Sequence, residues 1–251
     1  MSGYRAEGVV LRTRPLGEAD LVVTLYTAEE GKVEAVARGG RRLRSRLLGC
    51  IQPFSHGRYL LWRGRTLDSL SQGELVRSFR ELREDLLRMA CASYLAELVD
   101  GLTPEREPSG AIFSLLLEGW GFLAASPPET NLLLNGVSVF ELRLLNILGY
   151  APQLWQCLSC KTAEEGEWYF GIRTGGVLCA RCASQDETAR PLSGETLGGL
   201  RQLAGAPLAR AGVLRLSPGA RTEMRELLKE YIVYRAEREL KSAGFLDLVR
   251  G

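Results

Sequence analysis

The sequence predicts an α+β protein of more than one domain: an N-terminal OB-fold β-barrel and a C-terminal all-α domain with an inserted four-cysteine zinc ribbon. Three observations lead to this prediction. Strand-type alternation fills roughly the first 75 residues, helical periodicity follows, and two Cys-x2-Cys pairs interrupt the helical region. We expect the OB-fold domain at residues 1–79, the helical domain at 80–150 and 191–251, and the zinc-ribbon insert at 151–190.

Five segments of the first domain have the composition of strands. They are rich in β-branched or aromatic residues and are separated by turn signals such as Pro15, Gly17 and Gly31. The expected strands are residues 4–13, 21–27, 32–38, 53–62 and 65–75, with one helical turn at 45–50. Five short strands in this length fit a small OB-type barrel, and an SH3-like barrel is the alternative.

The hydrophobic period changes after Ser78. Apolar residues from Leu87 to Leu98 fall on one helical face, and residues 111–124 are apolar nearly all round, which predicts a central helix. A third helix is expected over residues 131–148. Ser217 and Pro218 have the residue types that begin a helix, so we expect a long C-terminal helix from this point.

Charge is distributed unevenly along the chain. The net charge is +2, but residues 1–80 hold 14 basic and 8 acidic residues, while the remainder holds 18 and 22. A basic first domain indicates a polyanionic partner. We find neither a secretory signal nor a run of about 18 apolar residues, so no membrane span is expected. We therefore expect a cytoplasmic protein whose six cysteines do not form disulfides.

Arginine is concentrated in residues 37–65, which contain no Asp or Glu. Guanidinium groups bind phosphate through two donors at once, and interleaved aromatic residues can stack on bases. The alternative is a solvated charged surface, but such surfaces usually mix both signs. Tyr59 and Trp62 either stack on bases or lie in the barrel core. The candidate nucleic-acid contacts are Lys32, Arg38, Arg41, Arg42, Arg44, Arg46, Arg58, Arg63 and Arg65.

Four cysteines have the spacing of a metal site. Cys157 and Cys160 form one Cys-x2-Cys pair, and Cys179 and Cys182 form a second one 18 residues later. Each pair lets two thiolates reach one ion from a tight turn, so together they predict a tetrahedral Zn²⁺ site. Four thiolates leave no open position, which makes the zinc structural rather than catalytic. Buried free cysteines, or a lost site, are the alternative.

The sequence offers little that would support catalysis. His56 is the only histidine, no phosphate-binding GxxxxGK[ST] motif is present, and Cys50 and Cys91 have the character of core residues. We therefore expect a protein that is not an enzyme. A nuclease or phosphotransfer enzyme would need a convergent carboxylate cluster with a catalytic metal, and the sequence gives no sign of one.

Several of these features occur together in one bacterial family. The stretch EGVVLRTRPLGEADLVVTLYTAEEGKVEAVARGGRRLRSRLLGCIQPFS resembles RecO, the bacterial recombination mediator, as do the four-cysteine ribbon and the segment ELKSAGF at residues 239–245. The resemblance covers both domains. It implies an OB domain, a helical domain and, in many members, a zinc module.

The resemblance also implies a function. RecO proteins bind single- and double-stranded DNA, anneal complementary strands, and act with RecR, often with RecF, to load RecA onto DNA coated by single-strand-binding protein. On this basis we expect a DNA repair protein of the bacterial nucleoid that is not an enzyme. The alternative is a protein-interaction adaptor whose basic barrel docks an acidic partner without binding DNA.

Overall fold

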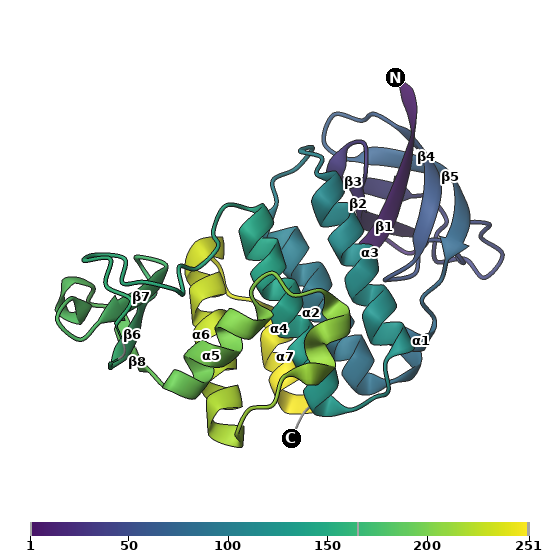
Figure 1. The fold of residues 1–251 in the computed structure, drawn as a ribbon. Helices are drawn as coiled ribbons and strands as arrows, with labels where there is room; N and C mark the ends of the chain where they lie inside the picture. Colours follow the sequence, from purple (N-terminus) through teal and green to yellow (C-terminus); the bar gives the residue numbers. More distant parts are fainter. Residues whose placement is uncertain (1, 165, 250–251) are drawn as a thin grey trace. The chain divides into compact units, whose positions relative to one another are not determined.

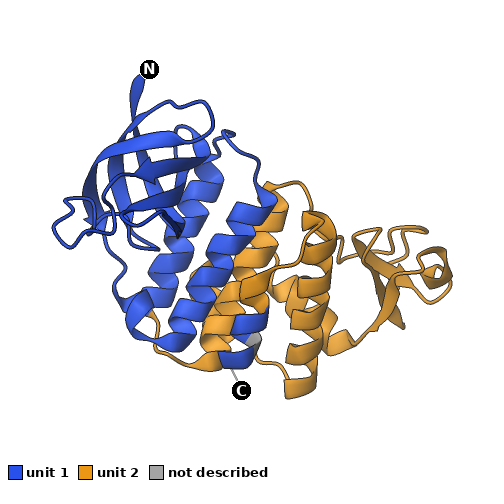
Figure 2. Ribbon diagram, turned by 180° about the vertical axis from the view of Figure 1, so that it is seen from behind, with its two compact units in different colours: residues 1–125, 244–251 blue, residues 126–243 orange. Residues whose placement is uncertain are grey.

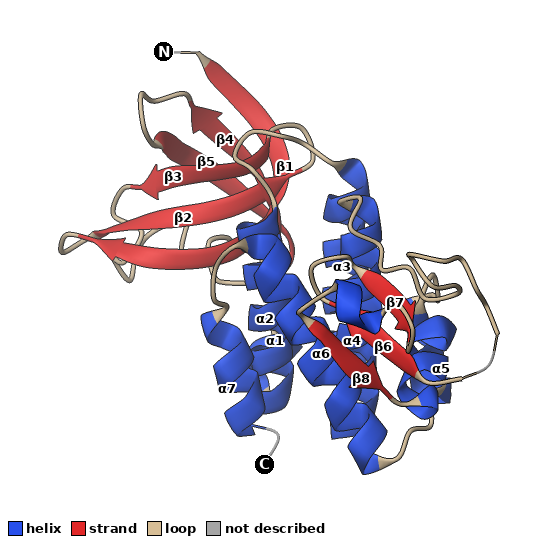
Figure 3. Ribbon diagram, turned by 90° about the vertical axis from the view of Figure 1, so that its left-hand side faces the viewer, coloured by secondary structure: helices blue, strands red, loops and turns tan. Residues whose placement is uncertain are grey.

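The computed structural model describes residues 2–164 and 166–249. The chain divides into two compact units, Met1–Ala125 with Gly244–Gly251 and Ser126–Ala243 (Figure 2). The strands form two separate sheets, a barrel in the first unit and a three-stranded sheet in the second (Figure 3). The first helices belong to the same unit as the barrel. The boundary at residue 79 marks where strands give way to helices, and as a domain boundary it stays a prediction.

Five strands close into a barrel in the order β1-β2-β3-β5-β4 (Figure 1). They are β1 (Gly3–Leu16), β2 (Asp20–Thr27), β3 (Gly31–Ala37), β4 (His56–Trp62) and β5 (Asp68–Arg77). All neighbours are antiparallel except β3 and β5. The long strand β1 pairs with both β2 and β4, and an irregularity between Val10 and Arg12 helps it to bend. This closed five-stranded barrel confirms the predicted OB class.

Alternation along the strands fills the barrel interior. In β3, Val33, Ala35 and Ala37 are buried while the residues between them are half-buried. The segment at 45–50, predicted as one helical turn, forms consecutive hydrogen-bonded turns, and the Ile51 N–H donates to the Leu47 carbonyl at 3.1 Å as in a single helical turn. These turns carry Leu47 and Cys50 into the same buried cluster.

Three helices follow the barrel in the first unit: α1 (Glu81–Glu84), α2 (Leu86–Leu102) and α3 (Gly110–Ala125). Helix α2 begins where the Asp85 carboxylate accepts a hydrogen bond from the Arg88 N–H at 2.8 Å. Trp120 of α3 is fully buried, and its ring packs edge-on against Phe54 and Phe79 at 5.5 and 6.0 Å. The apolar residues of α3 therefore form part of the core of this unit.

The connection between α2 and α3 lies against the barrel. The Arg106 N–H donates to the Lys32 carbonyl at 3.0 Å, and the Lys32 ammonium donates to the carbonyls of Asp100 and Thr103. A side chain at Gly31 would come within 2.4 Å of the Glu107 backbone, and Gly31 has a φ of +65°. Only glycine suits this turn, because it removes both the collision and the backbone strain.

The second unit contains helices and a small ribbon. Its elements are α4 (Thr130–Ile147), β6 (Trp168–Gly171), β7 (Gly176–Cys179), a short 3₁₀ turn at Ala183–Gln185, β8 (Ala189–Leu192), α5 (Gly194–Leu203), a second 3₁₀ segment at Leu208–Val213, and α6 (Pro218–Ala236). The three strands pair in the order β7-β6-β8. The ribbon therefore extends two residues past the predicted end of the insert at residue 190.

The long helix predicted after Ser217 is present as α6, and a second helix follows it. The Ser217 hydroxyl accepts from the Ala220 N–H at 3.2 Å, and Pro218 occupies the first turn. Glu237 adopts a left-handed φ of +53°, which ends α6 at Ala236. The 19-residue α6 confirms the predicted long helix, and a separate helix, α7 (Lys241–Val249), follows it. Within the described ranges, no helix has the length and hydropathy needed to cross a bilayer.

Candidate nucleic-acid interface and candidate metal centre

The arginine-rich stretch after β3 forms an anchored loop. We call residues 38–46 the basic loop. The Gly39 N–H donates to the Asp20 carboxylate at 2.7 Å, and the Arg41 N–H donates to the Ala19 carbonyl at 2.9 Å. Gly39 has a φ of +64°, which glycine adopts without strain. The turn between β1 and β2 thus holds the base of the basic loop in place.

The arginines of the basic loop are exposed to solvent. In the part of the chain that the structure describes, no carboxylate forms an ion pair with any of them; they are Arg38, Arg41, Arg42, Arg44 and Arg46. Only Arg41 directs its guanidinium inward, donating to the carbonyls of Gly17 and Glu18 at 3.2 and 3.1 Å. The loop therefore presents positive charge that internal acids do not neutralise.

Four of these arginines surround one open hollow of roughly 420 Å³. Its lining is Arg38, Gly39, Arg42, Arg44, Ser45, Arg46, Leu47 and Ser71. No carboxylate belongs to this lining. Guanidinium groups around a single hollow suit a phosphate or another polyanion, because their charges add where the anion would sit.

The other predicted arginine contacts lie outside the basic loop, and they differ in whether a carboxylate already pairs with them. Arg58 lies 3.6 Å from a carboxylate oxygen of Glu7, and Arg63 donates to both carboxylate oxygens of Glu30 at 2.8 and 2.6 Å. Arg65 is exposed. The structure does not bring these three into the hollow lined by the basic loop.

Lys32 has a different environment from the arginines. Its side chain is 13% exposed, and its ammonium lies 3.5 Å from the Asp100 carboxylate in addition to its two backbone carbonyl acceptors. These three oxygens use the donors that a phosphate would need. We therefore leave Lys32 out of the proposed phosphate contacts.

The two aromatic candidates on β4 have opposite surroundings. Tyr59 is 1% exposed, and its hydroxyl donates to the Cys50 carbonyl at 2.7 Å. Burial raises the pKa of Tyr59 far above its ordinary value. Trp62 is 40% exposed at the end of β4. Of the two alternatives left by the sequence, the structure places Tyr59 in the barrel core, and Trp62 is the more exposed of the two rings.

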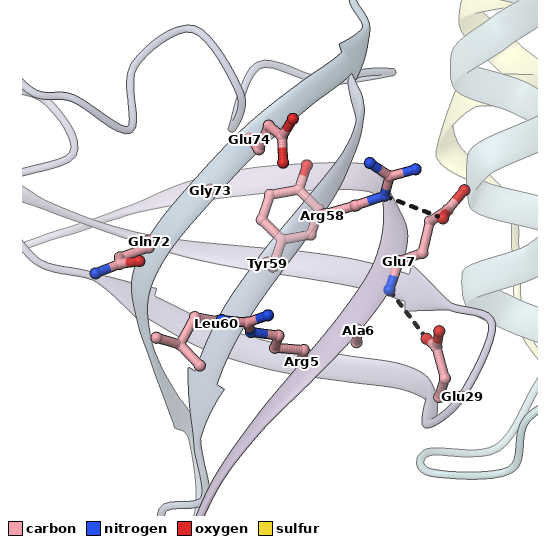
Figure 4. Close-up of a pocket in the computed structure, with 10 residues that line it drawn as sticks. All are labelled: Arg5, Ala6, Glu7, Glu29, Arg58, Tyr59, Leu60, Gln72, Gly73 and Glu74. Atoms are coloured by element: carbon pink, nitrogen blue, oxygen red, sulfur yellow. Dashed lines mark hydrogen bonds and ion pairs between the residues drawn. The ribbon is translucent and has the colours of Figure 1, made fainter.

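A second hollow, of about 430 Å³, lies over β1, β4 and β5 (Figure 4). Its lining mixes both signs and consists of Arg5, Ala6, Glu7, Glu29, Arg58, Tyr59, Leu60, Gln72, Gly73 and Glu74. Within it, the Glu7 carboxylate faces Arg58, and the Glu7 N–H donates to the Glu29 carboxylate at 3.0 Å. Three carboxylates make this hollow a poorer site for a polyanion than the one lined by the basic loop.

The four predicted metal ligands come together at one end of the ribbon. The ligand atoms of Cys157, Cys160, Cys179 and Cys182 all lie within 4.8 Å of one another. The sulfur atoms of Cys160 and Cys179 are 3.7 Å apart. In a tetrahedron with zinc–sulfur bonds of about 2.3 Å, the sulfurs are about 3.8 Å apart. The four cysteines therefore fit a single metal ion of this kind.

Local hydrogen bonds close the two cysteine turns and favour the thiolate form of Cys157. The Lys161 N–H donates to the Cys157 carbonyl at 3.0 Å, which closes the first turn, and the Cys182 N–H donates to the Cys179 carbonyl at 2.9 Å, which closes the second. Burial by itself raises the pKa of Cys157, but hydrogen bonds led by the N–H groups of Cys160 and Cys179 lower it to about 6. For Cys182, the hydrogen bond with Ser159 alone would lower the pKa, but burial and the neighbouring thiols raise it to about 11. A thiolate is the form that binds a metal.

The remaining candidates have structural surroundings. Cys50 and Cys91 are buried, as their sequence context predicts. His56 is also buried; its Nε2 lies 2.8 Å from a carboxylate oxygen of Glu7, and its ring packs against Phe113 at 5.9 Å. These contacts explain how the polar ring of His56 is accommodated in the buried part of the first unit.

Sequence reasoning missed the residue that anchors the basic loop. The sequence alone assigns no role to Asp20, yet its carboxylate accepts the Gly39 N–H. The available signal was the turn sequence Gly17-Glu18-Ala19-Asp20 before β2, since Asp commonly binds backbone N–H groups near turns.

The fold and these sites define a class: an OB-type barrel followed by a helical part that carries a four-cysteine ribbon. Family models described as recombination protein O N terminal and recombination protein O C terminal match residues 1–79 and 83–244. The chain belongs to the RecO family.

Curated relatives agree with this assignment over the full chain. It is 44% identical to "DNA repair protein RecO" of Symbiobacterium thermophilum, covering 100% of this chain and 99% of that protein. The protein of the same name from Pelotomaculum thermopropionicum is 42% identical, with 98% and 94% covered. That of Bacillus subtilis is 34% identical, with 97% and 93% covered. Membership of this family supports a role in DNA repair.

Proposed function

We propose that this protein binds single- and double-stranded DNA through the basic loop, and that it does so without reading sequence. The observation that carries the proposal is the exposed group of loop arginines around one acid-free hollow. Contacts made by guanidinium groups to phosphates are independent of base identity. The proposed DNA contacts are Arg38, Arg42, Arg44 and Arg46 around the hollow, with Arg41, Arg58, Arg63 and Arg65 flanking them.

Strand annealing follows from the same surface. Two phosphodiester strands repel each other, and a cationic surface can hold both while their bases search for partners. From family membership we further propose that the protein acts with RecR, and often RecF, to help load RecA onto DNA coated by single-strand-binding protein. A protein with this activity would act at the bacterial nucleoid, in the cytoplasm.

The four-cysteine site is proposed to hold a structural Zn²⁺. Cys157, Cys160, Cys179 and Cys182 would be its ligands, and the all-thiolate set supports a closed rather than a catalytic site. The bound ion would hold the ribbon together. We also propose that the protein is not an enzyme. Incubation of labelled DNA with Mg²⁺ tests this directly, because cleavage would contradict it.

The DNA-binding proposal is tested by the salt dependence of binding. A variant with Arg38, Arg42, Arg44 and Arg46 replaced by Ala removes the guanidiniums around the hollow and keeps Arg41, which bonds to the β1–β2 turn. Each lost single-strand phosphate contact should flatten the log–log salt slope by about 0.7, so four should flatten it by nearly 3. The matched control is Arg80→Ala, an exposed arginine paired with Glu84 on α1.

Two results would contradict the proposal. A quadruple variant with the wild-type salt slope would exclude the basic loop as the phosphate site. Failure of the wild-type protein to retain naked DNA on a filter would favour the adaptor alternative, in which the barrel docks an acidic partner instead.

A further inference from the structure

The basic loop carries an apolar side chain at its tip. Leu43 is 93% exposed, more than any other large hydrophobic residue among those that the structure describes. The Ser45 N–H donates to the Arg42 carbonyl at 2.9 Å, so residues 42–45 form a hydrogen-bonded turn with Leu43 and Arg44 at its two central positions. Turn tips usually carry Gly, Asn, Asp, Ser or Pro, and the fold itself gains nothing from a leucine there.

The neighbours of Leu43 indicate what it would meet. Arg42 and Arg44 flank it directly, and both line the hollow that the structure leaves free of carboxylates. A phosphodiester strand held by these two guanidiniums would bring its bases within reach of the residue between them. Proteins that bend or unstack DNA commonly insert a leucine or another apolar residue between neighbouring bases.

The anchoring of the loop makes such an insertion feasible. An inserted side chain must be held against the resistance of stacked bases, which requires a fixed backbone. Arg41 supplies this through its N–H to the Ala19 carbonyl and its guanidinium to Gly17 and Glu18. On the other side of the turn, Leu47 is buried in the barrel core. Leu43 therefore projects from a turn that is fixed at both ends.

We propose that Leu43 is an apolar wedge that inserts between adjacent bases of the DNA whose phosphates the flanking arginines hold. This inference rests on the proposed DNA binding and adds a contact to the bases. Because one base plane resembles another, the wedge keeps binding independent of sequence. It also holds a base step open while a strand is bound, which favours pairing with an incoming strand over stacking within the first.

The test uses a single strand containing 2-aminopurine, whose fluorescence is quenched by stacking on neighbouring bases. At saturating concentrations of full-length wild-type protein, the fluorescence should rise. Leu43→Ser should abolish the rise while weakening affinity by less than about tenfold, since the phosphate contacts remain. Leu43→Met, which keeps an apolar side chain of similar volume, should retain the rise. The control Leu86→Ser changes an exposed leucine at the start of α2 and should behave as wild type.

An equal fluorescence rise with wild type and Leu43→Ser would overturn the wedge and leave DNA binding intact. Loss of a protein partner by Leu43→Ser, with unchanged 2-aminopurine signal, would likewise overturn it and identify Leu43 as a protein contact. Failure of the wild-type protein to bind the strand at all would instead contradict the proposed function itself. The failures of the two proposals are therefore distinguishable.

Discussion

Arg106 and Asp68 form an ion pair in the first unit: Nη2 of Arg106 lies 2.7 Å from Oδ1 of Asp68. The Asp68 side chain is 1% exposed and also accepts hydrogen bonds from the Tyr4 hydroxyl and, at 3.1 Å, from the Gly64 N–H. Asp68 begins β5, and Arg106 lies in the connection after α2. One buried carboxylate thus joins strands β1 and β5 of the barrel to the segment that leads into α3.

We predict that Asp68→Asn lowers the free energy of unfolding by about 2–3 kcal/mol, because it leaves the Arg106 charge without its buried partner. Urea unfolding at neutral pH measures this loss. The control is Glu84→Gln, which breaks an exposed pair with Arg80 and should cost no more than about 0.5 kcal/mol. Equal effects of the two substitutions would show that the buried pair contributes nothing special.

The same carboxylate should make stability depend on pH. Burial alone raises the pKa of Asp68, but hydrogen bonds from Arg106, Tyr4 and the Gly64 N–H lower it by more than burial raises it, so the folded pKa lies below the ordinary value. Its contribution is therefore complete above about pH 3.9 and is lost as the pH falls through the lower folded pKa. Unfolding measured from pH 5 downward should show a steeper loss for the wild type than for Asp68→Asn. Parallel curves would contradict this assignment.

Replacing Tyr59 by Phe should affect stability and leave DNA binding unchanged. The substitution removes the hydrogen bond to the buried Cys50 carbonyl, at a cost of about 0.5–1.5 kcal/mol. Because Tyr59 lies in the barrel core, the affinity of this variant for single-stranded DNA should match that of the wild type. A selective loss of DNA affinity in a fully folded Tyr59→Phe protein would show that this ring reaches the bases.

Metal analysis should find about one zinc ion per chain. Cys157→Ser should lose it, while Cys50→Ala, a change in the barrel core, should keep it. Since metal binding energy is folding energy for a small ribbon, the zinc-free variant should be cleaved by proteases within residues 151–192. Retention of zinc by Cys157→Ser would contradict the assignment of Cys157 as a ligand. An undigested ribbon without metal would contradict a structural role for the zinc.

The sequence predicted those features that depend on local pattern. Strand alternation and turn residues identify the barrel, and the spacing of the cysteines identifies the cluster at Cys157 and Cys182. The start of α6 follows from Ser217 and Pro218 in the same way. In each case the signal is a residue pattern that can be read directly along the chain.

Features that depend on distant residues could not be predicted in this way. Nothing in the sequence near Asp68 indicates Arg106 as its partner, because the two meet only after the barrel closes.

Helix α5 was missed because Gly194, Gly198 and Gly199 lower its intrinsic helix propensity. It is stabilised by the Ser193 cap, which accepts from the Thr196 N–H at 3.2 Å. The left-handed residue Glu237 likewise ends α6 without a glycine to mark the place.

The central claim is that exposed arginines of the basic loop hold DNA phosphates. The most direct measurement is chemical modification of arginine by phenylglyoxal, read by mass spectrometry with and without bound single-stranded DNA. We predict that DNA protects Arg38, Arg42, Arg44 and Arg46, while Arg80, the residue before α1, reacts equally in both samples. Equal modification of the loop arginines with and without saturating DNA would contradict the claim.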